Sequence, residues 1–339
     1  MSSTQTITGL VTLEAIRAAQ QRIAGVAVRT PLYRLERAPL RMAKFVHASE
    51  LPTDIYLKAE NEQPIGSFKL RGAYNKIAQL PPDVLKRGVI TYSSGNHAQG
   101  VAFAARALGT KAIIVMPDNA PLIKREATAA LCAEIVLVGP ASSERKLKAE
   151  ELEAQHGYTM VPPYDDEQII AGAGTCGMEI LEQLPNVELV ISPVSGGGLL
   201  SGTSTAIKLQ RPEVKVFGAE PELAGDATES FLKKKIITWP AEKTTRTIAD
   251  GLRTQSLGER NFAHVMQFVD GIVTVSEEEI LEALRVAFYA AGIYPEPSGA
   301  VSLAAALFHA DKLPPARKTV VIVSGGNLDP ALKQKLFAG

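Results

Sequence analysis

The chain has 339 residues, and its 36 Lys and Arg residues balance 36 Asp and Glu, so the formal charge is zero. This balance argues against a nucleic-acid partner, because proteins that bind nucleic acids normally carry a basic excess or a basic stripe. Two cysteines, Cys132 and Cys176, are too few for a disulfide framework. The N-terminal residues lack the pattern of a secretory signal, and no run of about 18 apolar residues is present to span a membrane. We therefore expect a cytoplasmic protein, without a membrane partner, that acts on small molecules.

Apolar segments rich in Val and Ile alternate along the chain with longer segments of helical period. In chain order, the pattern predicts a strand at 89–92, a helix at 98–108, a strand at 112–116, a helix at 124–133, a strand at 135–138, a helix at 143–156, strands at 189–193, 214–219 and 271–275, a helix at 277–291 and a strand at 319–323. Strands that alternate with helices of this length predict an α/β fold, in which helices cover both faces of parallel sheets.

Three short clusters of Gly, Ser and Asn directly follow predicted strands, at residues 93–97 (SSGNH), 195–198 (SGGG) and 324–327 (SGGN). In open α/β sheets, ligands bind beyond the carboxyl ends of the strands. Glycine lets the backbone approach a ligand and present its N–H groups to an anion. A single cluster of this kind is most simply a turn. Three of them together predict a bound anionic ligand.

Gly172, Gly174 and Gly177 match the spacing G-x-G-x-x-G, whereas a P-loop motif is absent from the sequence. No clear strand precedes these glycines, and no acidic residue follows the next strand where a ribose would need one. We interpret the three glycines as a tight helix start and reject dinucleotide binding.

Lys69 stands between two apolar residues, Phe68 and Leu70. A lysine is by default a solvated surface residue. In an apolar setting it is desolvated instead, which lowers its pKa toward the free amine that forms Schiff bases. These three residues alone leave both interpretations open.

Eight motifs in order along the chain resemble the fold-type II pyridoxal-phosphate enzymes, and within them the threonine/serine dehydratase and serine racemase group. The motifs are GSFKLRGA (66–73), SSGNHAQG (93–100), AGAGT (171–175), SGGGL (195–199), AEP (219–221), ADG (249–251), EPSGA (296–300) and SGGN (324–327). The resemblance implies a tryptophan-synthase-β-like α/β fold with two open parallel-type sheets covered by helices. It also implies a cofactor cleft between a large domain, residues 1–78 and 165–339, and a small mobile domain, residues 79–164.

The resemblance further implies how pyridoxal 5'-phosphate would be held. Lys69 would bind the cofactor as a Schiff base, with Phe68 beside the pyridine ring. Asn96 would contact the phenolic oxygen, and Ser324 would face the pyridine nitrogen. The phosphate would lie in a cradle in which serine replaces the first of the group's usual four glycines: Ser195, Gly196, Gly197, Gly198 and Leu199.

Substrate contacts follow from the same resemblance. Ser93, Asn96 and His97 would bind the carboxylate of an amino-acid substrate, with His97 as a binding residue and not as a base. The amine of Lys69 would remove the Cα proton, and Ser94 on the opposite face of Cα could return one. A turn serine that bonds its own backbone is the alternative interpretation of Ser94.

A divalent-cation site is also implied, at Glu220, Ala224 and Asp226. Two carboxylates and a main-chain carbonyl suit Mg²⁺, or Ca²⁺ or Mn²⁺ in its place. Acidic residues that follow a strand are more often solvated loop residues, so that interpretation stays open.

Two departures from the group's pattern carry information. Tyr164 stands where serine racemases commonly have Asn, which changes one contact at the cofactor edge. Because only residues 328–339 follow Asn327, we expect neither a C-terminal regulatory domain of the biosynthetic threonine dehydratase kind nor inhibition by isoleucine.

The predicted activity is that of a dehydratase or ammonia-lyase, which converts L-threonine, L-serine or a related β-hydroxy amino acid to a 2-oxo acid and ammonia. One alternative is a serine racemase, alone or with both activities. Another is a 3-hydroxyaspartate dehydratase, in which Arg71 or Arg145 would bind the extra carboxylate. A non-catalytic ligand sensor of the same fold is disfavoured because Lys69 and Ser94 are intact. Members of this group are commonly dimers, so the resemblance predicts a homodimer.

Overall fold

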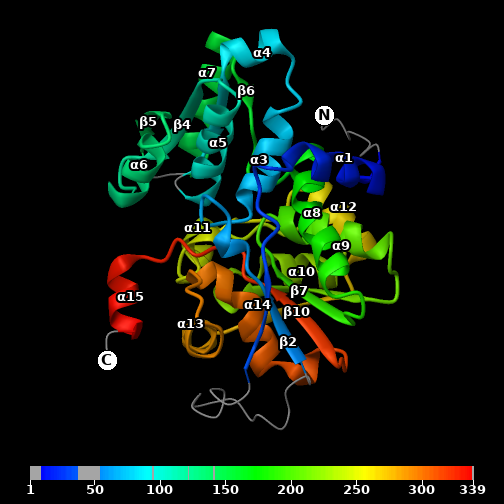
Figure 1. Ribbon diagram of the computed structural model, residues 1–339. Coiled ribbons are helices and arrows are strands. Elements are labelled where there is room, and N and C mark those ends of the chain that lie inside the picture. The colour runs from blue at the N-terminus through cyan, green and yellow to red at the C-terminus, as the bar shows by residue number, and fades with distance from the viewer. Residues whose placement is uncertain (1–8, 37–53, 94, 121, 140–141, 338–339) are drawn as a thin grey trace.

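The computed structural model describes residues 9–36, 54–93, 95–120, 122–139 and 142–337. Ser94, a predicted site residue, lies outside these ranges. The described strands form two sheets, which lie one above the other in Figure 1 with helix α3 between them. None of the helices in the described ranges is long and apolar enough to cross a bilayer.

The larger sheet has six strands in the order β1-β2-β10-β7-β8-β9. Neighbouring strands are parallel except for β1 and β2, which are antiparallel. The strand bounds, in sheet order, are Leu32–Arg34, Asp54–Lys58, Lys318–Ile322, Leu189–Pro193, Lys215–Pro221 and Gly271–Val275.

The smaller sheet has four parallel strands in the order β5-β4-β3-β6. Their bounds, in sheet order, are Glu134–Val138, Ala112–Pro117, Val89–Tyr92 and Thr159–Met160. The fold class predicted from the sequence, with two open and mainly parallel sheets covered by helices, is therefore confirmed.

Helices cover both faces of the larger sheet because successive side chains of a strand point to opposite faces. Ile191 and Val321 pack in one apolar cluster with residues of α13 and α14, whereas Val190 and Val320 pack in another with α8, α9 and α12. The described helices are α1 (Leu13–Ile23), α3 (Lys69–Ile77), α4 (Pro82–Arg87), α5 (Asn96–Ala107), α6 (Leu122–Ala129), α7 (Ser142–His156), α8 (Glu167–Gln183), α9 (Gly198–Lys208), α10 (Asp226–Lys233), α11 (Ala241–Thr244), α12 (Glu259–Phe268), α13 (Glu277–Ala291), α14 (Pro297–Phe308) and α15 (Pro330–Phe337), with short 3-10 turns η1 (Glu60–Glu62), η2 (Glu222–Ala224), η3 (Asp250–Leu252) and η4 (Ala310–Lys312).

Every strand predicted from the apolar pattern is present, within two residues of its expected bounds. Helix α13 has its predicted bounds, and its start is a full capping box: Ser276 accepts from the Glu279 N–H, and the Glu279 carboxylate accepts from the Ser276 N–H. The helix expected at 124–133 begins and ends earlier, at Leu122–Ala129. Strand β2 was not predicted, because the polar residues Asp54 and Lys58 at its ends leave no continuous apolar run.

The interpretation of the G-x-G-x-x-G motif as a helix start is wrong. Gly172, Gly174 and Gly177 lie inside α8, which begins at Glu167 after the N-cap Asp166. A Cβ atom on Gly172 would lie 2.5 Å from the Arg71 carbonyl oxygen in α3, and one on Gly174 or Gly177 would lie within 2.9 Å of a carbonyl of α9. The glycines therefore let α3 and α9 pack with their backbones directly against α8. This close packing offsets the low helix propensity of glycine.

Candidate active site

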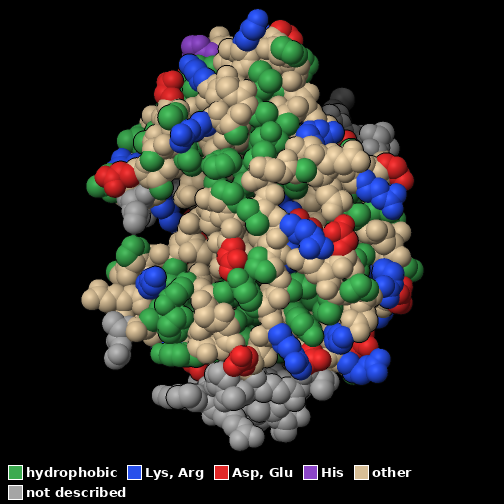
Figure 2. All heavy atoms as spheres, viewed as in Figure 1, with side chains coloured by type: hydrophobic (Ala, Val, Ile, Leu, Met, Phe, Trp, Pro, Cys, Tyr) green, Lys and Arg blue, Asp and Glu red, His purple; other side chains and the backbone are tan. Residues whose placement is uncertain are grey.

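A cavity of about 300 Å³ lies where strands of both sheets end. The residues that line it include Tyr92 at the end of β3, Pro193 at the end of β7 and Ser324 just after β10. Figure 2 shows the surface hollowed at one edge, between the part that carries α6 and the part that carries α15. The three Gly/Ser/Asn clusters thus meet in one place, as their position after parallel strands predicted. Leaving aside the two arginines named for 3-hydroxyaspartate, the described residues predicted to contact cofactor or substrate all line this cavity: Phe68, Lys69, Ser93, Asn96, His97, Ser195, Gly196, Gly197, Gly198, Leu199 and Ser324.

Lys69 is the first residue of α3, three residues after Gly66, whose φ of +73° favours glycine. Its Nζ atom donates a hydrogen bond to the Pro163 carbonyl oxygen at 2.6 Å and lies 5.0 Å from the centroid of the Phe68 ring. Burial lowers the pKa of Lys69 to about 8. The amine is therefore desolvated, and a larger share of it is neutral near physiological pH than in a solvated lysine.

The glycine loop at residues 195–198 joins β7 to α9, and Gly197 adopts a left-handed conformation with φ of +101°. The first N–H groups of α9 have no partner within the helix and point toward the loop, where the helix dipole favours an anion. A Cβ atom on Gly196 would lie 2.5 Å from the ring of Tyr164, and one on Gly197 would lie 2.8 Å from Asn261 Cβ. The loop therefore has no room for larger residues at these two positions.

Glu296 is a functional candidate that the motif analysis left without a role. It caps α14 and lines the cavity, and its Oε1 atom accepts a hydrogen bond from Asn96 Nδ2 at 2.6 Å. Asn96 Oδ1 in turn accepts from Asn327 Nδ2 at 2.7 Å. Burial, with a further contribution from Asp250, raises the pKa of Glu296 to about 7. Its signals in the sequence are its place in the EPSGA motif and its position directly before the proline that opens a helix.

His97 is buried in the first turn of α5, with Nε2 2.9 Å from the Val161 carbonyl oxygen. Because a carbonyl can only accept, Nε2 carries the proton, and Nδ1 is an acceptor without a partner among the described residues. Burial, and then the charge of Lys69, lower the pKa of His97 to about 3. The ring therefore stays neutral and cannot donate to a carboxylate. We expect the backbone N–H of His97, and not its ring, to contact the substrate carboxylate.

Residues 23–325 match the sequence model of the pyridoxal-phosphate dependent enzymes. The chain belongs to this family. It is 42% identical over 322 residues to an L-threonine ammonia-lyase of Thermotoga maritima, a match that covers 94% of this chain and 76% of the relative. It is 37% identical to an L-threo-3-hydroxyaspartate ammonia-lyase of Saccharomyces cerevisiae, covering 90% of this chain and 92% of the relative.

Among solved structures, the chain is similar to the serine racemase of Dictyostelium discoideum. The TM-score is 0.85 at 37% sequence identity, and the match covers 94% of this chain and 99% of that structure. These relatives confirm the group within the pyridoxal-phosphate dependent enzymes that the eight motifs predicted.

The cavity fits the cofactor of a pyridoxal-phosphate dependent enzyme in two respects. The desolvated amine of Lys69 suits a Schiff-base bond to an aldehyde. The glycine loop, closed to any Cβ at Gly196 and Gly197, keeps its backbone N–H groups open to a phosphate. Tyr164, which stands where serine racemases commonly have Asn, packs its ring on this loop, and burial raises its pKa to about 12.

The predicted metal-binding residues lie apart from the residues that line the cavity. Glu220 is in β8, Ala224 ends η2, and Asp226 opens α10. Both carboxyl groups are buried, and Asp226 Oδ2 has no hydrogen-bond partner among the described residues. Glu220 accepts from the backbone N–H groups of Ala227 and Thr228.

Burial, and then the charge of Asp226, raise the pKa of Glu220 to about 8, and burial raises that of Asp226 to about 7. Two uncompensated buried carboxylates are the donor set that a hard divalent cation prefers. No group of three or more His, Cys, Asp or Glu in the described part of the chain could hold a metal ion. A cation at this place would therefore depend on the two carboxylates, the Ala224 carbonyl and water.

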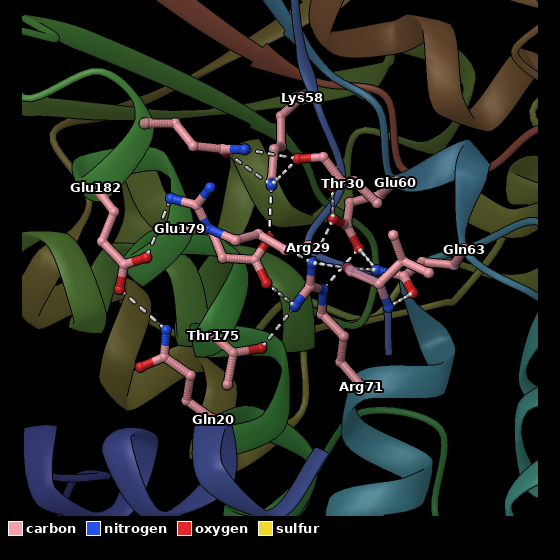
Figure 3. A network of polar contacts seen from close by, with 12 residues as sticks. Gln20, Arg29, Thr30, Lys58, Glu60, Gln63, Arg71, Thr175, Glu179 and Glu182 are labelled. Atoms are coloured by element: carbon pink, nitrogen blue, oxygen red, sulfur yellow. Dashed lines mark hydrogen bonds and ion pairs between the residues drawn. The ribbon is translucent and has the colours of Figure 1, made fainter. Parts of the chain in front are cut away.

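Arg71 does not line the cavity, so its predicted role as a partner for a substrate carboxylate is wrong. Its side chain points away into a buried network between α3, β2 and α8, shown in Figure 3. The guanidinium donates to both oxygens of Glu60 at 2.7 Å and to both oxygens of Glu179 at 2.7 and 2.8 Å. Lys58 Nζ completes the network at 2.6 Å from Glu179. Arg145, the other predicted partner, does line the cavity.

Proposed function

We propose that this chain is a pyridoxal-phosphate dependent ammonia-lyase that converts a β-hydroxy amino acid, L-threonine, L-serine or a close relative, to a 2-oxo acid and ammonia. One observation carries the proposal: the desolvated amine of Lys69 and the anion-binding glycine loop at 195–198 line the same cavity. The ammonia-lyases of Thermotoga maritima and Saccharomyces cerevisiae, to which the chain is similar, support this choice of reaction.

The cofactor, when bound, supplies an electron sink for the pair left at Cα after proton removal. Lys69 would hold the cofactor and, once released, take the Cα proton as a neutral amine, which its lowered pKa favours. Phe68 would lie beside the ring, and the Ser324 hydroxyl would face the pyridine nitrogen. A hydroxyl partner need not protonate that nitrogen, which favours elimination over transamination.

The substrate carboxylate would bind at the start of α5, where Ser93, Asn96 and His97 line the cavity. The N-terminus of this helix favours an anion. Asn96 would also contact the phenolic oxygen of the cofactor while Glu296 holds its amide in place. Ser94 is our candidate for proton return on the opposite face of Cα.

A second candidate function is the dehydration of 3-hydroxyaspartate. The observation that favours it is the presence of Lys124 and Arg145 in the cavity lining, where either cation could face a second carboxylate. Lys124 already forms an ion pair with Asp250 in the same lining. A serine racemase is the third candidate, supported by the similarity to the Dictyostelium discoideum structure.

Product analysis separates these candidates. Purified enzyme with added cofactor is incubated with L-threonine, L-serine and L-threo-3-hydroxyaspartate, and 2-oxo acids are quantified alongside chiral separation of serine. We expect 2-oxobutanoate from threonine as the main product. D-serine in excess of pyruvate would instead select the racemase. The Lys69→Ala variant should lose turnover, whereas Lys235→Ala, at an exposed lysine, should keep it. Turnover by Lys69→Ala refutes the proposal.

We also propose that Mg²⁺, or Ca²⁺ or Mn²⁺, binds Glu220, Asp226 and the Ala224 carbonyl. The unpartnered Oδ2 of Asp226 and the burial of both carboxylates support this site. Addition of Mg²⁺ should raise the melting temperature of chelator-treated wild-type protein, because a ligand that binds only the folded state stabilises it. The same addition should leave Asp226→Asn unchanged, and an equal shift in both proteins would count against the site.

Three assignments that follow from the group complete the proposal. The enzyme would be a cytoplasmic homodimer. Residues 79–164 would form a small domain that closes over the substrate against residues 1–78 and 165–339. The placement of all four strands of the smaller sheet within residues 89–160 supports that division. Sedimentation analysis tests the dimer, and crystal structures with and without an amino acid test the closure.

A further inference from the structure

Two hydroxyl groups from segments far apart in the chain meet at the edge of the glycine loop. Ser195 Oγ lies 2.6 Å from Thr254 Oγ1, and the Thr254 backbone N–H also donates to Ser195 Oγ at 3.2 Å. Ser195 opens the loop after β7, whereas Thr254 follows the short turn η3. Both residues line the cavity.

The two hydroxyl groups carry two hydrogens, and only one of them can take part in the hydrogen bond between Ser195 and Thr254. If Thr254 donates its hydroxyl hydrogen to Ser195, the Ser195 hydrogen is left over, and if Ser195 donates, the Thr254 hydrogen is left over. Neither hydroxyl has another hydrogen-bond partner among the described residues. In both arrangements the pair therefore offers one O–H donor, which the cavity alone can satisfy.

The position of this donor points to an anion at the glycine loop. Ser195 directly precedes Gly196 and Gly197, whose backbone cannot carry a Cβ, and α9 begins at Gly198. Unpartnered N–H groups at the start of a helix attract an anion, and a hydroxyl beside them adds a further donor. Hydrogen bonds to a charged group are about twice as strong as those between neutral groups.

We propose that Ser195 and Thr254 act as one shared hydroxyl donor to the phosphate group of the cofactor. This inference rests on the proposed function, because it takes the glycine loop to be the phosphate site. The shared donor also ties the loop to the segment at 250–254, which lines the cavity as well. The first position of the loop, where serine stands in place of glycine, thereby gains a side-chain contact that glycine could not make.

The test compares two ligands that differ only in the phosphate group. Apoenzyme is titrated with pyridoxal phosphate and, separately, with pyridoxal, and binding is followed by the absorbance of the ligand. The variants are Ser195→Ala, Thr254→Val and their double variant, with Thr254→Ser as the control that keeps the hydroxyl. We expect each single variant to bind pyridoxal phosphate almost as the wild type does, because the remaining hydroxyl keeps a free hydrogen for the phosphate. Pyridoxal binding should not change in any variant.

The double variant should weaken pyridoxal phosphate binding by about 10-fold or more, because the O–H donor is lost only when both hydroxyls are removed. Thr254→Ser should bind both ligands as the wild type does. If the double variant loses equal affinity for both ligands, or keeps its affinity for pyridoxal phosphate but has a raised KM for the amino acid, the inference is overturned. The second of these results would place the hydroxyl pair at the substrate carboxylate. If wild-type protein binds no pyridoxal phosphate, the proposed function itself fails, and the inference with it.

Discussion

The buried network around Arg71 allows the loss of folding stability in an Arg71 variant to be predicted. Arg71→Met keeps much of the side-chain length but removes six hydrogen bonds, four of them to Glu60 and Glu179. Arg71 and Lys58 now balance the charges of those two carboxylates, and all four side chains are buried. The substitution therefore leaves one uncompensated negative charge in the protein interior.

Breaking a buried ion pair by removing one partner costs about 3–5 kcal/mol, because the remaining charge stays desolvated. We expect a loss of that size in the free energy of unfolding, measured by urea titration with circular dichroism. Arg34→Met serves as the matched control, since its ion pair with Asp54 lies on the surface. Exposed pairs of this kind contribute about 1 kcal/mol or less.

The loss should also depend on pH. In the wild type, burial acts to raise the pKa of Glu60, but the charge and hydrogen bonds of Arg71, together with Lys58 and Thr30, lower it overall. Without Arg71, burial dominates and raises that pKa above its ordinary value. A raised carboxyl pKa stabilises the fold at low pH, and this contribution is lost as pH rises through it. The variant should therefore fall further below the wild type at about pH 8 than at about pH 5.

A second substitution tests whether charge is the cause. Glu60→Gln in the Arg71→Met background restores neutrality, and it should recover about 1 kcal/mol or more of the lost stability. A loss of less than about 1 kcal/mol for Arg71→Met, together with no dependence on pH, would refute this account of the network.

Three further predictions concern the cavity. Gly196→Ala places a Cβ 2.5 Å from the Tyr164 ring, so it should weaken pyridoxal phosphate binding by about 10-fold or more; titration of apoenzyme measures this, and wild-type affinity would contradict it. Glu296→Gln should gain thermal stability relative to the wild type as pH rises through about 7, because the raised pKa of Glu296 makes its charged form costly; a constant difference across that range would be the contrary result. Lys69 in apoenzyme should react with an amine reagent with a midpoint near pH 8, since burial lowers its pKa to about 8; peptide mapping after labelling across pH checks this, and a midpoint near the ordinary lysine value would exclude a desolvated amine.

Local pattern was sufficient for most of the architecture and for much of the site. The strands at 89–92 and 189–193 were recognisable because buried parallel strands are continuous apolar runs. The clusters that follow them could be expected to meet, since the carboxyl ends of parallel strands lie at one edge of a sheet. Lys69 was assigned through the resemblance of the eight motifs, because its apolar neighbours alone left both interpretations open.

Contacts between distant residues decided the rest. Strand β2 was not predicted because Lys58 is buried in it. The charge of Lys58 is balanced by Glu179, 121 residues away in the sequence. The helical glycines, such as Gly174, have the same local pattern whether they open a helix or let two helices touch. Only the position of α9 distinguishes the two.

The amino-acid sequence by itself determined the class of fold and the glycine loop, because periodicity and glycine content are properties of neighbouring residues, and its ordered motifs indicated Lys69 through the family resemblance. The tertiary structure alone decided that Arg71 faces away from the cavity, that Glu296 holds Asn96, and that Thr254 meets Ser195. Each of these three contacts depends on which charged or polar groups, from segments far apart in the sequence, come together at one buried position. A linear pattern carries no record of that proximity.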